Sequence, residues 1–156
     1  MTYNRGMAVA YAHKWAFGRN PAFYNFDEVG GDCTNFVSQC IYAGSGVMNY
    51  TPDLGWYYKS PSNRAAAWTG VEYLYRFLTK NTARGPYAFE LQLEHAQPGD
   101  IIQLSFNPVR FSHTMLVVNI YPQILVSAHS DDSDNRPLDT YVYNSARLLH
   151  IEGVHR

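Results

Sequence analysis

One cysteine of the sequence has the surroundings of a catalytic nucleophile. Cys33 follows the turn Gly30-Gly31-Asp32, and because aspartate often caps helix N-termini, Cys33 is predicted to occupy the first position of a helix. Unpaired backbone N–H groups and the helix dipole favour negative charge there, which lowers the pKa of a thiol. The same N–H groups can stabilise the oxyanion that forms when a thiolate attacks an amide. Cys33 is therefore a candidate nucleophile.

The alternative for Cys33 is a purely structural role. In a helix its side chain shares one apolar face with Phe36, Val37, Cys40 and Ile41, and cysteine is commonly buried as a small apolar residue. The spacing of seven residues separates the Cα atoms of Cys33 and Cys40 by about 10 Å in a helix, beyond the roughly 7 Å that a disulfide allows. We therefore expect no disulfide between them and place Cys40 in the core.

A thiol nucleophile needs a base, and two of the six histidines are suitably placed. His113 opens a predicted strand and His129 ends the next one. If the hairpin turns around Tyr121, they lie opposite each other within one residue, with Cβ atoms about 5 Å apart. His113 could then accept the thiol proton while His129 orients its other ring nitrogen. Asp131 and Asp132 are rival orienting groups, and the alternative for both histidines is a structural, hydrogen-bonded role.

The sequence gives little support for a cofactor or a nucleic-acid partner. Cys33, His113, His129 and Asp131 are residue types that bind zinc, but their spacing matches no zinc motif. There is no glycine-rich nucleotide-binding loop, and the net charge of -1 offers no basic surface for phosphate backbones or anionic lipids. We therefore expect no cofactor, no metal ion and no nucleic acid.

Length and composition are those of an ordinary folded domain. The chain has 156 residues, of which 46% are hydrophobic and 16% charged, so we expect one domain over residues 1–156. A monomer is also expected, although neither length nor composition determines the oligomeric state. No run approaches the roughly 18 apolar residues of a spanning helix, so we expect no membrane span. The residues from Met1 to Gly6 do not form the apolar segment of a secretory signal, and the sequence leaves the compartment open.

The elements that must position these residues change in type along the chain. Apolar periodicity and capping residues predict helices over 4–17, 33–43 and 63–80, with a long surface loop over 45–61. Apolar runs between turn residues predict strands over 101–104, 111–120, 124–128 and 146–152. Helices followed by antiparallel strands indicate the α+β class, with N-terminal helices packed on one face of an antiparallel sheet.

Several segments together resemble a known family. The most specific is Gly30-Gly31-Asp32-Cys33-Thr34-Asn35-Phe36-Val37-Ser38-Gln39-Cys40. It is accompanied by Tyr24-Asn25-Phe26, Trp56-Tyr57-Tyr58, Trp68-Thr69, Pro98-Gly99-Asp100-Ile101-Ile102, Ser112-His113 and Ser127-Ala128-His129. From about residue 3 to about residue 151 the chain resembles the bacterial putative amidase domain family. That family is similar to the NlpC-type and CHAP cell-wall peptidases, which have a reduced papain-like fold.

The resemblance implies a papain-like cysteine hydrolase and assigns three roles. It makes Cys33 the nucleophile, His113 the base and His129 the residue that orients the base. It also implies hydrolysis of an amide bond, such as one in the peptides of peptidoglycan, and an extracellular or cell-wall setting. A Cys-His acyltransferase and a non-catalytic binding module of the same fold are the alternatives.

Aromatic residues are the main predicted contacts to substrate. Trp56 and Tyr57 lie in a long predicted loop and are expected to form one wall of the cleft, the alternative being that they pack on the helices. Asp27 stands where papain-like enzymes often have a glutamine that binds the oxyanion, so Tyr24 is considered for that role. The predicted substrate-binding residues are Asp32, Trp56, Tyr57 and Tyr24.

Overall fold

A computed structural model describes residues 2–156 of the chain. Its helices are α1 (Arg5–Trp15), α2 (Cys33–Ser45), α3 (Ala66–Thr69) and α4 (Val71–Lys80), with the short 3-10 helices η1 (Leu93–His95) and η2 (Leu138–Thr140). Its strands are β1 (Tyr58–Ser60), β2 (Asn63–Arg64), β3 (Gly85–Leu91), β4 (Ile101–Ser105), β5 (Phe111–Asn119), β6 (Leu125–Ala128), β7 (Ser133–Pro137) and β8 (Ser145–His155). No helix in this described part is long and apolar enough to cross a membrane.

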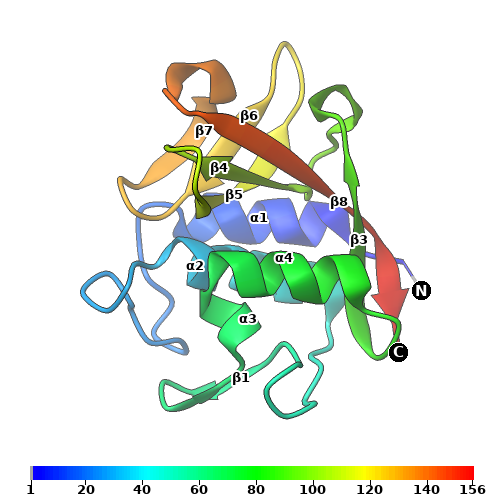
Figure 1. The fold of residues 1–156 in the computed structure, drawn as a ribbon. Coiled ribbons are helices and arrows are strands. Elements are labelled where there is room, and N and C mark those ends of the chain that lie inside the picture. Colours follow the sequence, from blue (N-terminus) through cyan, green and yellow to red (C-terminus); the bar gives the residue numbers. More distant parts are fainter. Residues whose placement is uncertain (1) are drawn as a thin grey trace.

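Most strands belong to one antiparallel sheet. Its order is β3-β8-β4-β5-β6-β7, and β1 and β2 form a separate two-stranded ribbon. Helices α1, α2 and α4 lie along one face of the larger sheet, as Figure 1 shows, and bury their apolar side chains against it. The predicted α+β class, with helices packed on an antiparallel sheet, is confirmed.

Strand β5 separates two packed cores, because successive side chains of a strand point to opposite faces of the sheet. Leu116 belongs to the core under the helices, whereas Met115 and Val117 belong to a smaller core on the other face. By the same alternation Thr114 faces the helices and His113 faces the smaller core. This difference of one residue decides how the predicted site is arranged.

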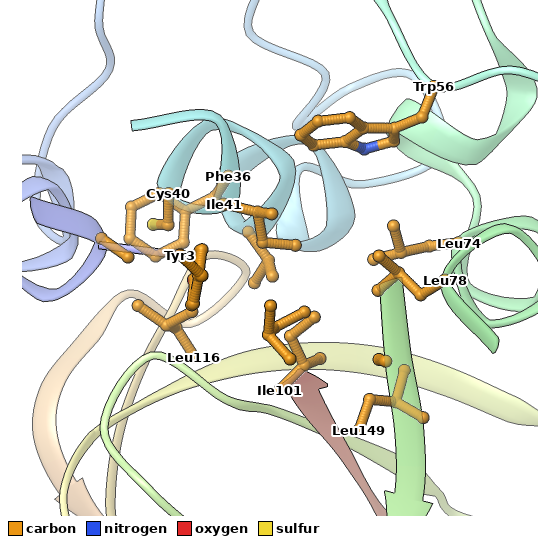
Figure 2. Close-up of a cluster of buried hydrophobic side chains, with 14 of the residues drawn as sticks. Tyr3, Phe36, Cys40, Ile41, Trp56, Leu74, Leu78, Ile101, Leu116 and Leu149 are labelled. Carbon is orange, nitrogen blue, oxygen red and sulfur yellow. The ribbon is translucent and has the colours of Figure 1, made fainter. Parts of the chain in front are cut away.

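The larger core contains Cys40, as predicted. Its side chain is fully buried beside Tyr3 and Phe36 under helix α2, where Figure 2 shows it at one end of the cluster. Both cysteines are free thiols, so the prediction that they do not bond to each other is confirmed. Burial raises the pKa of the Cys40 thiol well above its usual value, so this sulfur is an unreactive part of the core.

The predicted helix over 63–80 is wrong in its first part. Asn63 and Arg64 form strand β2, and the helical segments α3 and α4 are separated at Gly70, whose backbone is extended with φ -108° and ψ 128°. An extended residue cannot continue a helix. Helix α4 therefore starts again at Val71, and its first turn lies at the surface beside the predicted site.

The other predicted elements differ from the structure mainly at their ends. Helix α2 begins at Cys33 as predicted and runs past Gly44, because the left-handed residue that ends it is Gly46 with φ 73°. The predicted strands are confirmed as β4, β5, β6 and β8. Strands β3 and β7 were not predicted, and β7 is an edge strand of polar residues without an apolar alternation.

The segment before α1 packs closely on α2 at Gly44. A Cβ atom added there would lie 2.6 Å from the ring of Tyr3 and 2.7 Å from the carbonyl oxygen of Asn4. Gly44→Ala is therefore expected to lower the free energy of unfolding by about 1–3 kcal/mol in urea denaturation. The matched Gly6→Ala in α1, where the new Cβ meets nothing closer than 3.6 Å, should raise it by up to about 1 kcal/mol. Equal stability of the two variants would contradict this packing.

Candidate active site

Cys33 lies at the start of α2 with its sulfur directed at β5. The Thr34 hydroxyl lies 3.8 Å from the sulfur, and the backbone N–H groups of Thr114 and Thr34 act to lower the pKa of the thiol. The two threonine hydroxyls share a hydrogen bond of 2.9 Å, which fixes the start of α2 to β5. Strand β6 pairs with β5 only as far as Leu116, so Thr114 lies just beyond this pairing, at the edge of β5 that faces the start of α2.

Burial decides the charge of this thiol. Loss of hydration raises the pKa of Cys33, and the carboxylate of Asp32 adds to the rise, while the N–H groups of Thr114 and Thr34 oppose it with a smaller effect. The expectation that the helix start lowers this pKa is therefore wrong, because the residue is only 8% exposed and desolvation outweighs the helix N-terminus. Cys33 is a neutral thiol at pH 7.

His113 lies on β5 directly before Thr114, with its ring on the side of the smaller core. The rings of Phe106 and Tyr141 lie beside it, with centroids 6.3 Å and 6.2 Å away. Burial lowers the pKa of His113 to about 4, and the positive charge of Arg136 contributes to the shift. The imidazole is therefore neutral at pH 7. Among the described residues it makes no hydrogen bond to the sulfur of Cys33, although the backbone N–H of the next residue, Thr114, acts to lower the pKa of that thiol.

The register of β5 and β6 keeps His113 and His129 apart. Leu116 pairs with Ser127, and the two strands are antiparallel. Three residues before Leu116 is His113, and three residues after Ser127 is residue 130, so this register places residue 130, not His129, opposite His113. A shift of one residue moves a side chain to the other face of a sheet, and His129 accordingly faces the helices. The pairing of β6 with β5 ends at Ser127, whereas β7, on the other edge of β6, still pairs with it at Ala128. The structure therefore does not bring the two histidines together, and the predicted hydrogen bond between them does not form.

His129 instead forms a buried pair with Asp32. Its Nδ1 lies 2.5 Å from Oδ2 of Asp32, and its Nε2 lies 2.8 Å from the carbonyl oxygen of Trp15. The imidazole stacks on the ring of Phe36, with centroids 4.0 Å apart. The side chains of the pair are only 2% and 1% exposed. One imidazole therefore joins the end of α1, the start of α2 and the end of β6.

Asp32 occupies the N-cap position of α2, but its carboxylate makes no capping hydrogen bond to the helix. Its Oδ1 accepts hydrogen bonds from the N–H of Phe26 at 2.8 Å and from the side chain of Asn35 at 2.9 Å. Burial raises the pKa of Asp32, but these hydrogen bonds and the interaction with His129 outweigh burial and hold that pKa below its usual value. The predicted contact of Asp32 with substrate is therefore replaced by a role inside the protein.

The acidic residues considered for orienting a histidine are engaged with arginines. The guanidinium of Arg19 lies 2.9 Å from Asp132 and 3.0 Å from Asp27. The carboxylate of Asp131 lies 3.6 Å from Arg136 and is 93% exposed. Asp27, which stands where papain-like enzymes often have an oxyanion-binding glutamine, thus serves to hold Arg19.

The predicted aromatic wall is only partly at the surface. Trp56 is fully buried, donates a hydrogen bond of 3.0 Å to Ser38 and packs on Trp68, so the expectation that it faces substrate is wrong. It packs on the helices because its indole fills the larger core (Figure 2). Tyr57 is half-buried beside Tyr50, and Tyr24 is 46% exposed, so these two rings remain accessible.

The zinc alternative finds no support in residues 2–156. No group of three or more His, Cys, Asp or Glu side chains in that part of the chain is placed to hold a metal ion. The sulfur of Cys33 contacts threonine groups, and both ring nitrogens of His129 face Asp32, Trp15 or Arg19. These contacts explain why residues of suitable type do not form a metal centre.

A hollow of about 600 Å³ lies beside the two chain segments that lead to Cys33 and His113. Gly30 and Ser112 line it on one side, and Gly70, Val71 and Glu72 at the start of α4 line it on the other. Sequence reasoning did not find the α4 residues, because they fell inside one long predicted helix. The pattern that could have revealed them is the row of exposed, mostly polar side chains that recur at helical spacing on one face of this helix.

Comparison with known proteins assigns the chain to a family. Residues 2–151 match the family model described as Putative amidase domain, so the chain belongs to that family. It is also 38% identical over 120 residues to the uncharacterized protein YhbB of Bacillus subtilis strain 168. That match covers 74% of this chain and 37% of the relative, so the chain spans little more than a third of the relative's length. No solved structure matches the chain.

The Asp32–His129 pair gives a direct test of the described geometry. His129→Ala leaves a buried carboxylate without its main partner, so we expect the free energy of unfolding to fall by about 3–5 kcal/mol. His95→Ala at an exposed position should change it by less than about 0.5 kcal/mol. The double variant Asp32→Asn with His129→Gln removes the charge and should cost clearly less than His129→Ala. Chemical denaturation measures all three, and equal costs for the single and double variants would contradict the role of His129 as the main partner of a buried carboxylate.

Proposed function

We propose that this member of the amidase family is a thiol-dependent amide hydrolase in which Cys33 is the nucleophile and His113 the base. The observation that supports the proposal most is the position of the Cys33 sulfur. It lies at the N-terminus of α2 against the N–H of Thr114, the residue that follows His113 on β5. The family description supports amide hydrolysis, and the hollow beside Gly30 and Ser112 offers space for an extended substrate.

The proposed reaction starts from two neutral groups. The raised pKa of Cys33 and the lowered pKa of His113 disfavour a resting thiolate–imidazolium pair. As substrate binds, the ring of His113 turns away from the smaller core and toward the Cys33 sulfur. Its free ring nitrogen then accepts the thiol proton. The sulfur attacks the amide carbonyl carbon, and N–H groups at the start of α2 hold the oxyanion.

The second half of the proposed reaction returns the proton and releases the acid. His113 donates its proton to the leaving amine as the C–N bond breaks, which leaves an acyl group on Cys33 as a thioester. Water then attacks the thioester carbon while His113 takes its proton. The C–S bond breaks, the carboxylic acid leaves, and His113 returns the proton to the sulfur as the thiol. In this scheme His129 is a positioning residue, because it holds Asp32 and so fixes the turn that carries Cys33.

The same proposal extends to fold type and substrate. We propose that residues 1–156 form one domain of the reduced papain-like type found in NlpC and CHAP peptidases. A cysteine at a helix start and a histidine at a strand start support this relationship. Peptides of peptidoglycan are the proposed substrate, and purified peptidoglycan is therefore the first material to test.

A non-catalytic binding module is the second candidate function. Two observations favour it: the burial of the Cys33 sulfur and its lack of a hydrogen bond to His113. In a binding module the cysteine would serve only to pack α2 on β5. The two candidates differ in whether the thiol is needed for turnover.

Removal of each cysteine separates these candidates. Cys33→Ala should lower the release of peptide fragments from purified peptidoglycan by at least about 10³-fold, because it removes the nucleophile. Cys40→Ala, a matched change of a buried cysteine in the same helix, should retain activity. Mass spectrometry of the soluble fragments measures the release. Equal digestion by wild type and Cys33→Ala would refute the proposal, and no digestion by the wild type would favour the binding module.

The pKa of His113 predicts the acid limit of activity. A base must be neutral, so kcat/KM should fall only as pH drops through about 4, instead of near the ordinary histidine value of 6.5. Arg136→Gln removes a positive charge that disfavours the imidazolium, so the midpoint should move to higher pH. Both effects are measured by the dependence of kcat/KM on pH, with a soluble peptide obtained from peptidoglycan as the substrate. A midpoint near 6.5 that does not respond to Arg136→Gln would contradict the proposed state of His113.

A further inference from the structure

Helix α4 lies between two hollows of the surface. The first is the hollow of about 600 Å³ beside Gly30 and Ser112, and the second, of about 460 Å³, is lined by the segment from Asn49 to Gly55 and by the C-terminal half of α4. Tyr73 and Arg76 line both hollows, so the two adjoin each other across these side chains. The two hollows are therefore neighbours along α4, the helix that Figure 1 shows at the front of the molecule, and together they are called the α4 groove.

The exposed side chains of α4 in this groove form a single stripe. Tyr73, Arg76 and Lys80 follow one another at i, i+3 and i+7, which places them on one face of the helix. A helix of 10 residues is about 15 Å long. An extended peptide of about four or five residues covers that length, at about 3.3 Å per residue. The groove therefore fits a short extended peptide better than a single amino acid.

The groove is more basic than the chain as a whole, which has a net charge of -1. The side chain of Arg76 is 60% exposed, and its contact with Glu72 is long, at 4.0 Å. The Glu72 carboxylate is held more closely by Arg147, at 2.9 Å. Lys80 and Arg110 also line the two hollows, and Asp53 is the acidic side chain on the opposite wall of the second one. Arg76 and Lys80 are thus available to an anionic ligand.

We propose that this groove along α4 binds an acidic peptide, with a carboxylate of the peptide held by Arg76 and Lys80 and the exposed ring of Tyr73 beneath its backbone. The proposal deepens the proposed amide hydrolysis by naming its substrate class, and it rests on that function only for the fate of the bound peptide. The two cations lie one helical turn apart, a separation that one carboxylate side chain can bridge. The far hollow then binds the part of the peptide away from the cleaved bond.

Binding of matched peptides tests the proposal without any need for turnover. Three capped five-residue peptides with a fluorescent label carry glutamate, glutamine or lysine at the central position. Fluorescence anisotropy with the Cys33→Ala protein measures their affinities. The glutamate peptide should bind about fivefold more tightly than the glutamine peptide, as expected for a partly exposed ion pair, and the lysine peptide should bind most weakly.

Substitution in the stripe identifies the groups responsible. The double change Arg76→Gln with Lys80→Gln should remove the preference for glutamate, and the change of both to glutamate should reverse it in favour of lysine. Lys14→Gln on α1, which removes a cation outside the groove, should leave the preference unchanged. No binding, equal binding of the three peptides, or a preference that persists in the double variant would overturn the proposal. If the protein prefers the glutamate peptide but the wild type hydrolyses no amide bond, the proposed reaction is refuted and the proposed binding site is not.

Discussion

The buried pair of Asp32 and His129 is the interaction on which the site depends. It joins the residue before Cys33 to the end of β6, while His129 also reaches the carbonyl oxygen of Trp15 at the end of α1. A carboxylate this deeply buried is tolerated because His129, the N–H of Phe26 and Asn35 all satisfy it. The start of α2 is thereby tied to the end of β6 and to the end of α1, while the hydrogen bond between Thr34 and Thr114 ties it to β5.

This arrangement also sets the charges at the site. A cysteine at a helix start is expected to ionise easily, yet the Cys33 sulfur is buried beside the ionised Asp32, and both effects raise its pKa. His113 is buried in turn, and its pKa is lowered. The site therefore holds two neutral groups on adjacent backbone segments. A proton transfer between them costs least once substrate has displaced water and the developing charges have partners, which ties the proposed chemistry to binding.

The sequence was informative where a local pattern determines structure. The start of α2 at Cys33 follows from local turn and helix signals, and the apolar runs locate β4, β5, β6 and β8. The predicted pairing of His113 with His129 was wrong, because it depends on a strand register in which an error of one residue moves a side chain to the other face of the sheet. The burial of Trp56 likewise depends on tertiary packing that no local pattern specifies.

Trapping of an acyl group on the thiol is the most direct test of the central claim. An activated ester of a short glutamate-containing peptide, mixed with the protein and quenched in acid, should add the mass of its acyl group to the fragment that carries Cys33. His113→Ala should slow the appearance of this adduct, since the thiol then lacks its base. An intact protein with no adduct, or with the acyl group on Cys40 instead, would show that Cys33 is not a nucleophile and would contradict the account.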